Sequence, residues 1–154
     1  MFQTVEISMQ EIDRIQPLWK KLIQANASNS PYFADYYGTF EFTVRKGFLQ
    51  EKLDGGAKLY TAVLVDEETQ QDIGFVTATY HTGVSFGEVE MLYVEEAYRG
   101  KSLGSKLLTM ALECMDRENI RDRKLCVTYG NDAALKLYQK FGFYPFTIDC
   151  LYKA

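Results

Sequence analysis

The chain has 154 residues, of which 47% are hydrophobic and 25% charged, and its formal net charge is −4. The apolar fraction is too high and the net charge too small for a disordered chain, and the length suits one domain. No apolar run approaches the roughly 18–20 residues of a membrane-spanning helix, and the start, Met1 to Glu6, lacks a signal-peptide pattern. The sequence therefore predicts one cytoplasmic domain over residues 1–154, with no membrane partner.

The acidic balance and the scarcity of histidine argue against two further classes of function. Nucleic-acid binding needs a basic surface that displaces counterions from phosphates, so we expect no nucleic-acid partner. With one histidine, His81, and three widely spaced cysteines, the chain has no zinc-ligand pattern, so we expect no metal and a structural role for His81. The cysteines, Cys114, Cys126 and Cys150, are expected to be buried free thiols.

Hydrophobic periodicity predicts helices in the first third of the chain. Apolar residues recur at three- and four-residue steps from Ile12 to Ile23, with Pro17 as the one disfavoured residue, and a polar loop follows at 26–31. The aromatic-rich segment 32–53 is expected to contain a second helix that ends near Gly55, with most of its aromatic side chains in the core.

The rest of the chain predicts an alternation of strands and helices. Segments rich in β-branched and aromatic residues indicate strands, and the short polar loop between the first two indicates an antiparallel pair. The expected elements are strands at 59–65, 73–80 and 88–94, an amphipathic helix at 103–119, a strand at 124–128, a helix at 131–141 capped by Asn131 and ended by Gly142, and a strand-like tail at 144–152. This order predicts a mixed α/β fold.

The segment that joins the third strand to the long helix has the features of an anion site. Helix N-termini present unpaired N–H groups and the positive end of the helix dipole. Gly100 and Gly104 allow the backbone to approach a ligand closely. Arg99, Lys101 and Lys106 add a local positive field within an acidic chain. On its own, such a strand–helix turn is more often purely structural.

Two motifs taken together resemble the GNAT superfamily of acyl-CoA-dependent N-acetyltransferases. The first, Arg99-Gly100-Lys101-Ser102-Leu103-Gly104, is separated by four residues from the strand end Leu92-Tyr93-Val94. The family pattern is Arg or Gln, two residues, Gly, one residue, and Gly or Ala. The second, residues 131–143, matches Asn-x-x-Ala-x-x-Leu-Tyr-x-x-x-Gly-Phe. The resemblance covers the second half of the chain. Ser102 departs from it, since the family usually has glycine there.

The resemblance implies a single GNAT-like domain with acetyl-CoA as co-substrate, built on a mostly antiparallel sheet with splayed parallel strands. The motif positions carry over as cofactor contacts at Leu92, Val94, Arg99, Gly100, Lys101, Ser102, Gly104, Ser105, Asn131 and Tyr138. Ser102 restricts the backbone where glycine is usual, but its hydroxyl offers a phosphate a hydrogen bond.

The resemblance also implies direct acetyl transfer to a primary amine in a ternary complex, which agrees with the absence of a Ser–His–Asp or Cys–His set. It places Tyr138 as the acid toward the leaving thiolate and the N–H of Leu92 at the oxyanion. Side chains at 88, 90, 92 and 94 are expected to share one face of the strand. Glu90 is the first candidate for the general base and Glu88 the second; solvated carboxylates at a strand end, and a core role for Tyr138, are the alternatives.

The amine acceptor stays open between a polyamine, an aminoglycoside, a peptide N-terminus and a small amino compound. Candidate contacts to a cationic amine lie in the aromatic-rich segment, at Asp35, Tyr36, Tyr37 and Glu41. The alternative functions are a catalytically silent acyl-CoA-binding sensor and a structural α/β interaction protein. A strand-like tail is also consistent with a homodimer.

Overall fold

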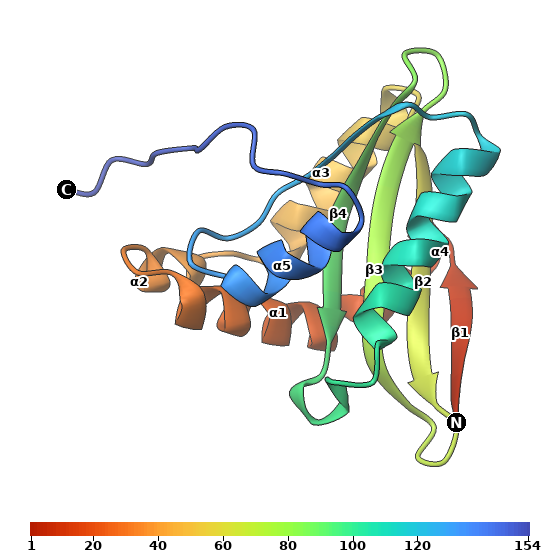
Figure 1. Cartoon of the computed structure of the whole chain (residues 1–154), viewed down its shortest axis with the longest axis horizontal. Helices are drawn as coiled ribbons and strands as arrows, with labels where there is room; N and C mark the ends of the chain where they lie inside the picture. The colour runs from red at the N-terminus through yellow and green to blue at the C-terminus, as the bar shows by residue number, and fades with distance from the viewer.

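A computed structural model describes residues 1–154 and contains one five-stranded sheet with helices on both faces (Figure 1). The strands lie in the sheet in their sequence order. The elements, in chain order, are β1 (Phe2–Ile7), η1 (Met9–Ile15), α1 (Gln16–Asn29), α2 (Ala34–Tyr37), α3 (Phe42–Asp54), β2 (Lys58–Asp66), β3 (Gln71–His81), β4 (Phe86–Val94), η2 (Glu96–Tyr98), α4 (Leu103–Arg117), β5 (Asp122–Leu125) and α5 (Asp132–Lys140).

The sheet is antiparallel except at one edge. Strands β1 to β4 pair antiparallel with their neighbours, and β5 pairs parallel with β4. Strands β2 and β3 are buried along most of their length because helices cover both of their faces. The predicted mixed α/β fold, with a mostly antiparallel sheet, is confirmed. No helix is both long and apolar enough to cross a membrane.

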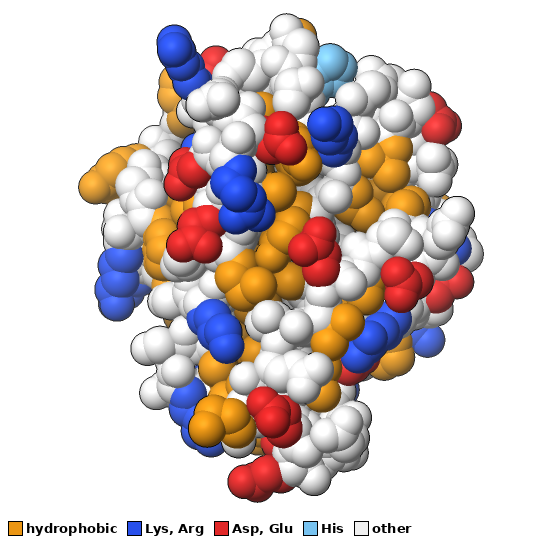
Figure 2. Space-filling model, turned by 90° about the vertical axis from the view of Figure 1, so that its right-hand side faces the viewer, with side chains coloured by type: hydrophobic (Ala, Val, Ile, Leu, Met, Phe, Trp, Pro, Cys, Tyr) orange, Lys and Arg blue, Asp and Glu red, His pale blue; other side chains and the backbone are white.

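Two hydrophobic clusters hold the helices against the sheet. One face packs α4 and α5, with the apolar stripe of α4 fully covered, and we call it the α4 face. The other packs η1, α1 and α3, and we call it the α1 face. Each fully buried large apolar side chain contributes roughly 1.5–3 kcal/mol. On the side that carries α4 and β1, acidic and basic side chains are interspersed among apolar atoms (Figure 2).

The N-terminal third differs from the prediction in two places. Residues 2–7 form the edge strand β1, which pairs with β2, where periodicity predicted only helices. A six-residue edge strand is too short to show a clear pattern of its own. Helix α1 continues to Asn29, into the predicted loop. Pro17 lies in the first turn of α1, where its missing N–H removes no intrahelical bond.

The aromatic-rich segment forms two helices, α2 and α3, and most of its aromatic side chains are not in the core. Of these residues only Phe42 is buried, against Trp19. Tyr32, Tyr36, Phe40 and Phe48 are exposed. The prediction of core packing for this segment is therefore wrong: helix α2 has only four residues and buries none of them.

The last two predicted strands also differ from the structure. The strand expected at 124–128 is β5, which begins two residues earlier and ends three residues earlier. The tail predicted as a strand at 144–152 has no secondary structure, and residues 144–154 make no backbone–backbone hydrogen bond. In Figure 1 it leaves α5 and runs away from the sheet. A strand needs a partner, and the tail pairs with none of the five strands in this structure.

Only one of the three thiols is buried as predicted. Cys114 packs on the α4 face, whereas Cys126 and Cys150 are exposed. Cys126 directly follows β5, and Cys150 lies in the tail. Their exposure has the same cause as the missing strand, because nothing in the chain covers the outer edge of β5 or the tail.

Candidate active site

The parallel strands β4 and β5 separate halfway along β4. Their pairing ends at Val89 and Leu125, while β4 continues along β3 as far as Val94. From residue 90 onward the β5 side of β4 therefore has no neighbouring strand. A strand that loses a neighbour inside a sheet exposes a row of backbone donors and acceptors.

The backbone groups on this open side belong to Leu92 and Val94. Glu95 donates its N–H to the carbonyl oxygen of Ile73 on β3, at 2.8 Å. Successive residues of a strand direct their backbone groups to opposite sides, so those of Leu92 and Val94 point away from β3. Arg99 supports this placement, because its Nε donates to the carbonyl oxygen of Val94 at 3.0 Å.

A β-bulge interrupts β4 at Glu90. Thr77 of β3 pairs with Met91, but the next residue, Ala78, pairs with Val89, so Glu90 has no partner of its own. An extra residue in one strand bends it and shifts the alternation of the side chains that follow by one position.

The bulge divides four side chains that were expected to share a face. Glu88 and Glu90 reach Lys52 of α3, on the α1 face. Leu92 and Val94 instead pack against the cluster of the α4 face. The predicted common face is therefore wrong beyond Glu90, although the two carboxylates do lie together.

Glu90 is a buried carboxylate held by three donors. Its side chain is 1% exposed; Oε1 accepts from Nη2 of Arg45 at 3.0 Å and Oε2 from Oγ1 of Thr79 at 2.6 Å, and Lys52 forms a close ion pair with Oε2. Burial alone would raise the pKa of Glu90, but the hydrogen bonds from Lys52 and Thr79 and the charge of Arg45 outweigh it and lower the pKa.

Glu88 is the more accessible carboxylate of the pair. Its side chain is 18% exposed, and its one ion pair joins Oε1 to Nζ of Lys52 at 3.3 Å. Both glutamates line an open cavity of about 560 Å³ between α3, β4 and the segment after β5. The cavity is lined by Arg45, Phe48, Glu51, Lys52, Glu88, Glu90 and Cys126.

The cations of this cavity were not identified from the sequence. Arg45 and Lys52 lie seven residues apart on α3, a spacing that places both on one face of a helix. That spacing was the available signal, but which strand the helix covers depends on the tertiary fold. The aromatic-segment candidates Asp35, Tyr36, Tyr37 and Glu41 do not line the cavity.

The loop after β4 presents free N–H groups at the start of α4. The first bond of the helix runs from the N–H of Lys106 to the carbonyl oxygen of Ser102, at 3.0 Å. The N–H groups of Leu103, Gly104 and Ser105 have no such partner, and no side chain caps them. A Cβ on Gly100 would touch nothing within 4 Å, so the space beside the loop is open. Unpaired donors beside open space fit an anionic phosphate.

The loop backbone and its cations are fixed by local contacts. Gly100 and Ser102 both adopt positive φ angles, of 82° and 58°. Lys101 Nζ lies 5.6 Å from the ring centres of Phe2 and Tyr98. These cation–π contacts hold the positive charge of Lys101 beside the loop.

The second motif forms α5 as predicted. Oδ1 of Asn131 accepts the N–H of Ala134 at 3.1 Å, which confirms the N-cap, and Gly142 follows the helix with a φ of 90°. Tyr138 is 9% exposed and packs on the α4 face. Burial raises the pKa of Tyr138 to about 12. Its hydroxyl makes no hydrogen bond within the protein. Because no fully enclosed polar side-chain atom lacks a hydrogen bond, this hydroxyl is accessible from outside.

His81 lies away from these groups. It is half-buried at the end of β3, and its Nδ1 accepts the N–H of Gly83 at 3.1 Å. This contact shapes the β3–β4 turn.

Comparisons with known proteins agree with this geometry. The model of the Acetyltransferase (GNAT) family matches residues 22–143. A mycothiol acetyltransferase from Renibacterium salmoninarum is 28% identical over 132 residues, which are 82% of this chain and 38% of that protein. N-alpha-acetyltransferase 30 from Saccharomyces cerevisiae is 40% identical over 57 residues, 37% of this chain and 32% of that protein. The chain thus spans well under half the length of these relatives.

The fold comparison covers nearly the whole chain. A crystal structure of a GNAT-family acetyltransferase from Staphylococcus aureus Mu50 superimposes with a TM-score of 0.72 at 13% identity, over 96% of this chain and 87% of that one. At this identity the likeness concerns the fold alone. Together with the family match over most of the sequence, it leads to one conclusion: the chain belongs to the GNAT acetyltransferase family.

Proposed function

We propose that this protein transfers an acetyl group from acetyl-CoA to a primary amine. The observation that carries the proposal is the 3.0 Å hydrogen bond from Arg99 to the carbonyl oxygen of Val94, which joins the anion-binding loop to the open backbone of β4. A phosphate bound at the loop would thus belong to a ligand whose extended arm lies along Leu92 and Val94.

The binding step uses backbone groups for the most part. The N–H groups of Leu103, Gly104 and Ser105 would hold the diphosphate, with Lys101 beside them. Val94 would pair with the extended arm in the manner of an added strand. Asn131 would contribute by fixing the start of α5, since its side chain caps that helix.

Acetyl-CoA supplies a thioester, and the chain supplies the groups around it. The N–H of Leu92 would donate to the carbonyl oxygen as negative charge develops there; one such donor is worth about 3 kcal/mol. The Tyr138 hydroxyl, kept protonated by its raised pKa, would donate to the departing sulfur. An unperturbed thiol pKa of about 8.5 lies below that of Tyr138, so Tyr138 would stabilise the departing thiolate by a hydrogen bond and keep its proton. The proton that converts the thiolate to a thiol would come from water.

The contacts of the two glutamates favour Glu88 over Glu90 as the general base, which reverses the order expected from the sequence. Glu90 is nearer to Leu92, but two cations and a hydroxyl hold it and lower its pKa, so it is a poor base. Glu88 is partly exposed in the same cavity and has one ion pair. We propose that the acceptor's proton passes through water to Glu88, and that Glu90 fixes Arg45 and Lys52.

The acceptor proposed is a primary ammonium group in the cavity beside Glu88. The Lys52 ammonium already lies between the two carboxylates, which supports the proposal that this cavity accepts an ammonium group. The relatives are named a mycothiol acetyltransferase and an N-alpha-acetyltransferase, two names that indicate different acceptors. The proposal therefore extends to the amino group of the acceptor and not to the rest of that molecule.

A binding assay followed by a turnover assay tests the function. Acetyl-CoA should raise the melting temperature. Gly104→Val should remove this shift, because a Cβ at Gly104 lies 3.6 Å from Cδ2 of Leu137 and the added methyl groups would crowd α5 against the first turn of α4. Thiol release should then appear with at least one member of a panel of polyamines, aminoglycosides and peptide N-termini. Binding without turnover across the panel would favour the silent sensor instead, and no binding would contradict both.

Glu88→Gln is expected to lower kcat about 100-fold at neutral pH, because a general base typically contributes roughly 100- to 10,000-fold. The acetyl-CoA thermal shift should be unchanged, since Glu88 lies away from the loop. At high pH, where the free amine is abundant, the variant should regain most of its rate. Unchanged turnover at neutral pH would remove Glu88 from the proposed mechanism.

A further inference from the structure

Lys52 carries a primary amine in the cavity that the proposed acceptor would enter. Its Nζ lies 3.3 Å from Oε1 of Glu88, the proposed base, and forms the close ion pair with Oε2 of Glu90. The Lys52 side chain is 38% exposed and lines the cavity, so it is open to solvent and to a ligand. An ammonium group of this protein thus occupies the position proposed for the ammonium group of the acceptor.

Lys52 can leave Glu90 without leaving that carboxylate unpaired. Oε1 of Glu90 also accepts from Nη2 of Arg45 at 3.0 Å, and Oε2 accepts from Oγ1 of Thr79 at 2.6 Å. Nη2 of Arg45 donates to the carbonyl oxygen of Glu90 as well, at 3.2 Å, so its position does not depend on Lys52. The Lys52 amine is therefore held in the cavity but not locked in one position.

The cavity extends from Lys52 to the point where β4 and β5 separate. Cys126, on its opposite wall, directly follows Leu125, the last residue of β5 that pairs with β4. Beyond this point the β5 side of β4 is open, and the N–H of Leu92 points to that side. Glu90 lies two residues before Leu92, about 6–7 Å along a strand. The flexible four-carbon stem of lysine allows Nζ to cover part of that distance by a change of rotamer.

We propose that the protein acetylates its own Lys52, an inference that rests on the proposed acetyl transfer. Glu88 would take a proton from the Lys52 ammonium, and the free amine would attack the carbonyl carbon of the thioester. Nζ forms a bond to that carbon as the carbon–sulfur bond breaks, and the leaving thiolate takes a proton from water. No other reactant is needed. Because Lys52 is tethered beside the base, its amine has a high effective concentration without a binding step.

Acetylation would change the cavity in two ways. It removes the charge of Lys52, so the ion pairs with both glutamates are lost. The acetamide also fills space beside Glu88 that the acceptor would use. The modified protein should bind acetyl-CoA as before and acetylate an added amine more slowly. The reaction would thus limit the activity when the acceptor is scarce.

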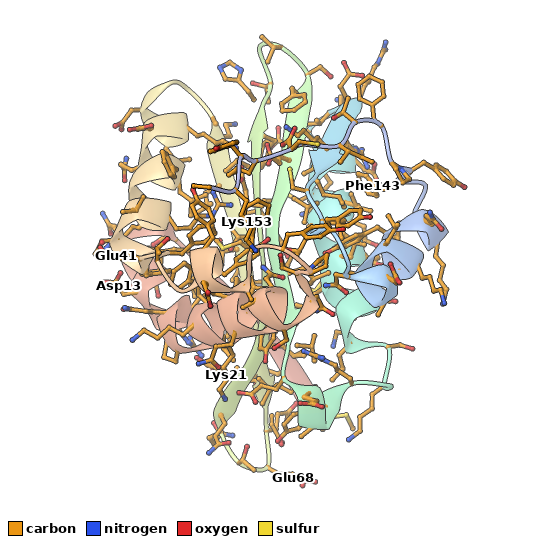
Figure 3. The ribbon with its side chains drawn as sticks, turned by 90° about the vertical axis from the view of Figure 1, so that its left-hand side faces the viewer. Asp13, Lys21, Glu41, Glu68, Phe143 and Lys153 are labelled. Atoms are coloured by element: carbon orange, nitrogen blue, oxygen red, sulfur yellow. The ribbon has the colours of Figure 1, made fainter.

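Lys46 is the matched control within the same helix. Its side chain is 39% exposed, and it also forms an ion pair, with Oδ1 of Asp13 at 2.8 Å. Lys46 does not line the cavity, and in Figure 3 Asp13 lies at the outer margin of the molecule, to the side of the strands. Burial alone would lower the pKa of Lys52, but the hydrogen bonds and charges of Glu90 and Glu88 outweigh it and raise the pKa. Purely chemical acetylation therefore has no reason to favour Lys52.

The first test incubates the full chain with acetyl-CoA alone and follows each lysine by peptide mass spectrometry. Lys52 should gain the mass of one acetyl group about 100-fold faster than Lys46, since a general base contributes roughly 100-fold or more. The rate per molecule should not change on dilution, because the reaction occurs within one chain. Gly104→Val, which should not bind acetyl-CoA, should acetylate Lys52 no faster than Lys46. Equal rates at the two lysines of the wild type, or a rate that rises with protein concentration, would overturn the proposal.

The second test separates this inference from the proposed function. Lys52→Arg keeps a cation beside the glutamates but has no primary amine. Incubation with acetyl-CoA before an amine is added should slow the later thiol release of the wild type, whereas Lys52→Arg should keep the rate with which it starts. Thiol release with an added amine but no acetyl group on Lys52 would overturn this inference and leave the proposed function intact. Absence of both would overturn the two together.

Discussion

Glu90→Gln is expected to lower the free energy of unfolding by about 2 kcal/mol, although Glu90 is the carboxylate nearest in sequence to Leu92, the proposed oxyanion donor. Removing one member of a buried ion pair typically costs about 3–5 kcal/mol. The side chains of Arg45 and Lys52 are 25% and 38% exposed, so water compensates part of their lost partner. Glutamine keeps the contact with Thr79 but not the charge that both cations need.

Urea unfolding of Glu90→Gln and Glu88→Gln side by side measures the difference. Glu88→Gln should lie within about 0.5 kcal/mol of wild type, as a partly exposed ion pair contributes little. Adding Lys52→Met to Glu90→Gln should recover part of the loss, because it removes one unpaired cation. Equal stability of the two glutamine variants would mean that Glu90 has no anchoring role.

The same carboxylate gives the stability a pH dependence of known sign. Because folding lowers the pKa of Glu90, the group stabilises the fold above the carboxyl's ordinary pKa of 4.5, and this contribution is lost as the pH falls through the lower folded value. The stability gap between wild type and Glu90→Gln should therefore narrow on acidification below that ordinary value.

Tyr138→Phe is expected to lower kcat about 100-fold while the acetyl-CoA thermal shift stays the same. The hydroxyl has no partner within the protein, so its removal leaves no group unsatisfied and costs the fold little. The loss of rate corresponds to the lower end of what a positioned proton donor contributes, roughly 100- to 10,000-fold.

Tyr60→Phe is the matched control for this change. Tyr60 is also buried on the α4 face, and its pKa is likewise raised to about 12 by burial, but it lies on β2, away from the splayed strands. Single-turnover rates of the two variants, with acetyl-CoA saturating, give the comparison. A normal rate for Tyr138→Phe would leave Tyr138 a core residue.

Local signals explain what the sequence predicted correctly. The strands β2 to β4, the stripe of α4 and the capped helix α5 each carry their own pattern, and the two motifs connect them in order. The unpaired amides of the loop could be predicted from the position of the helix start, Leu103, alone. These features depend on neighbours within a few residues, which a sequence displays directly.

The features that were missed depend on distant parts of the chain. The bulge at Glu90 arises from the register of β3 against β4, and it decides that Leu92 leaves the face of the glutamates. The placement of Arg45 and Lys52 against that bulge depends on how α3 lies on the sheet. The tail at 144–152 carries a strand pattern, but whether it pairs depends on a partner outside its own segment.

The backbone of Ser102 has a consequence for affinity. A residue other than glycine in the left-handed region pays roughly 1–2 kcal/mol for that conformation. Ser102 therefore holds this backbone conformation only because the surrounding folded chain imposes it. The free-energy cost arises once, when the chain folds. The proposed phosphate ligand would find the loop already in this conformation and would lose little binding energy in shaping it.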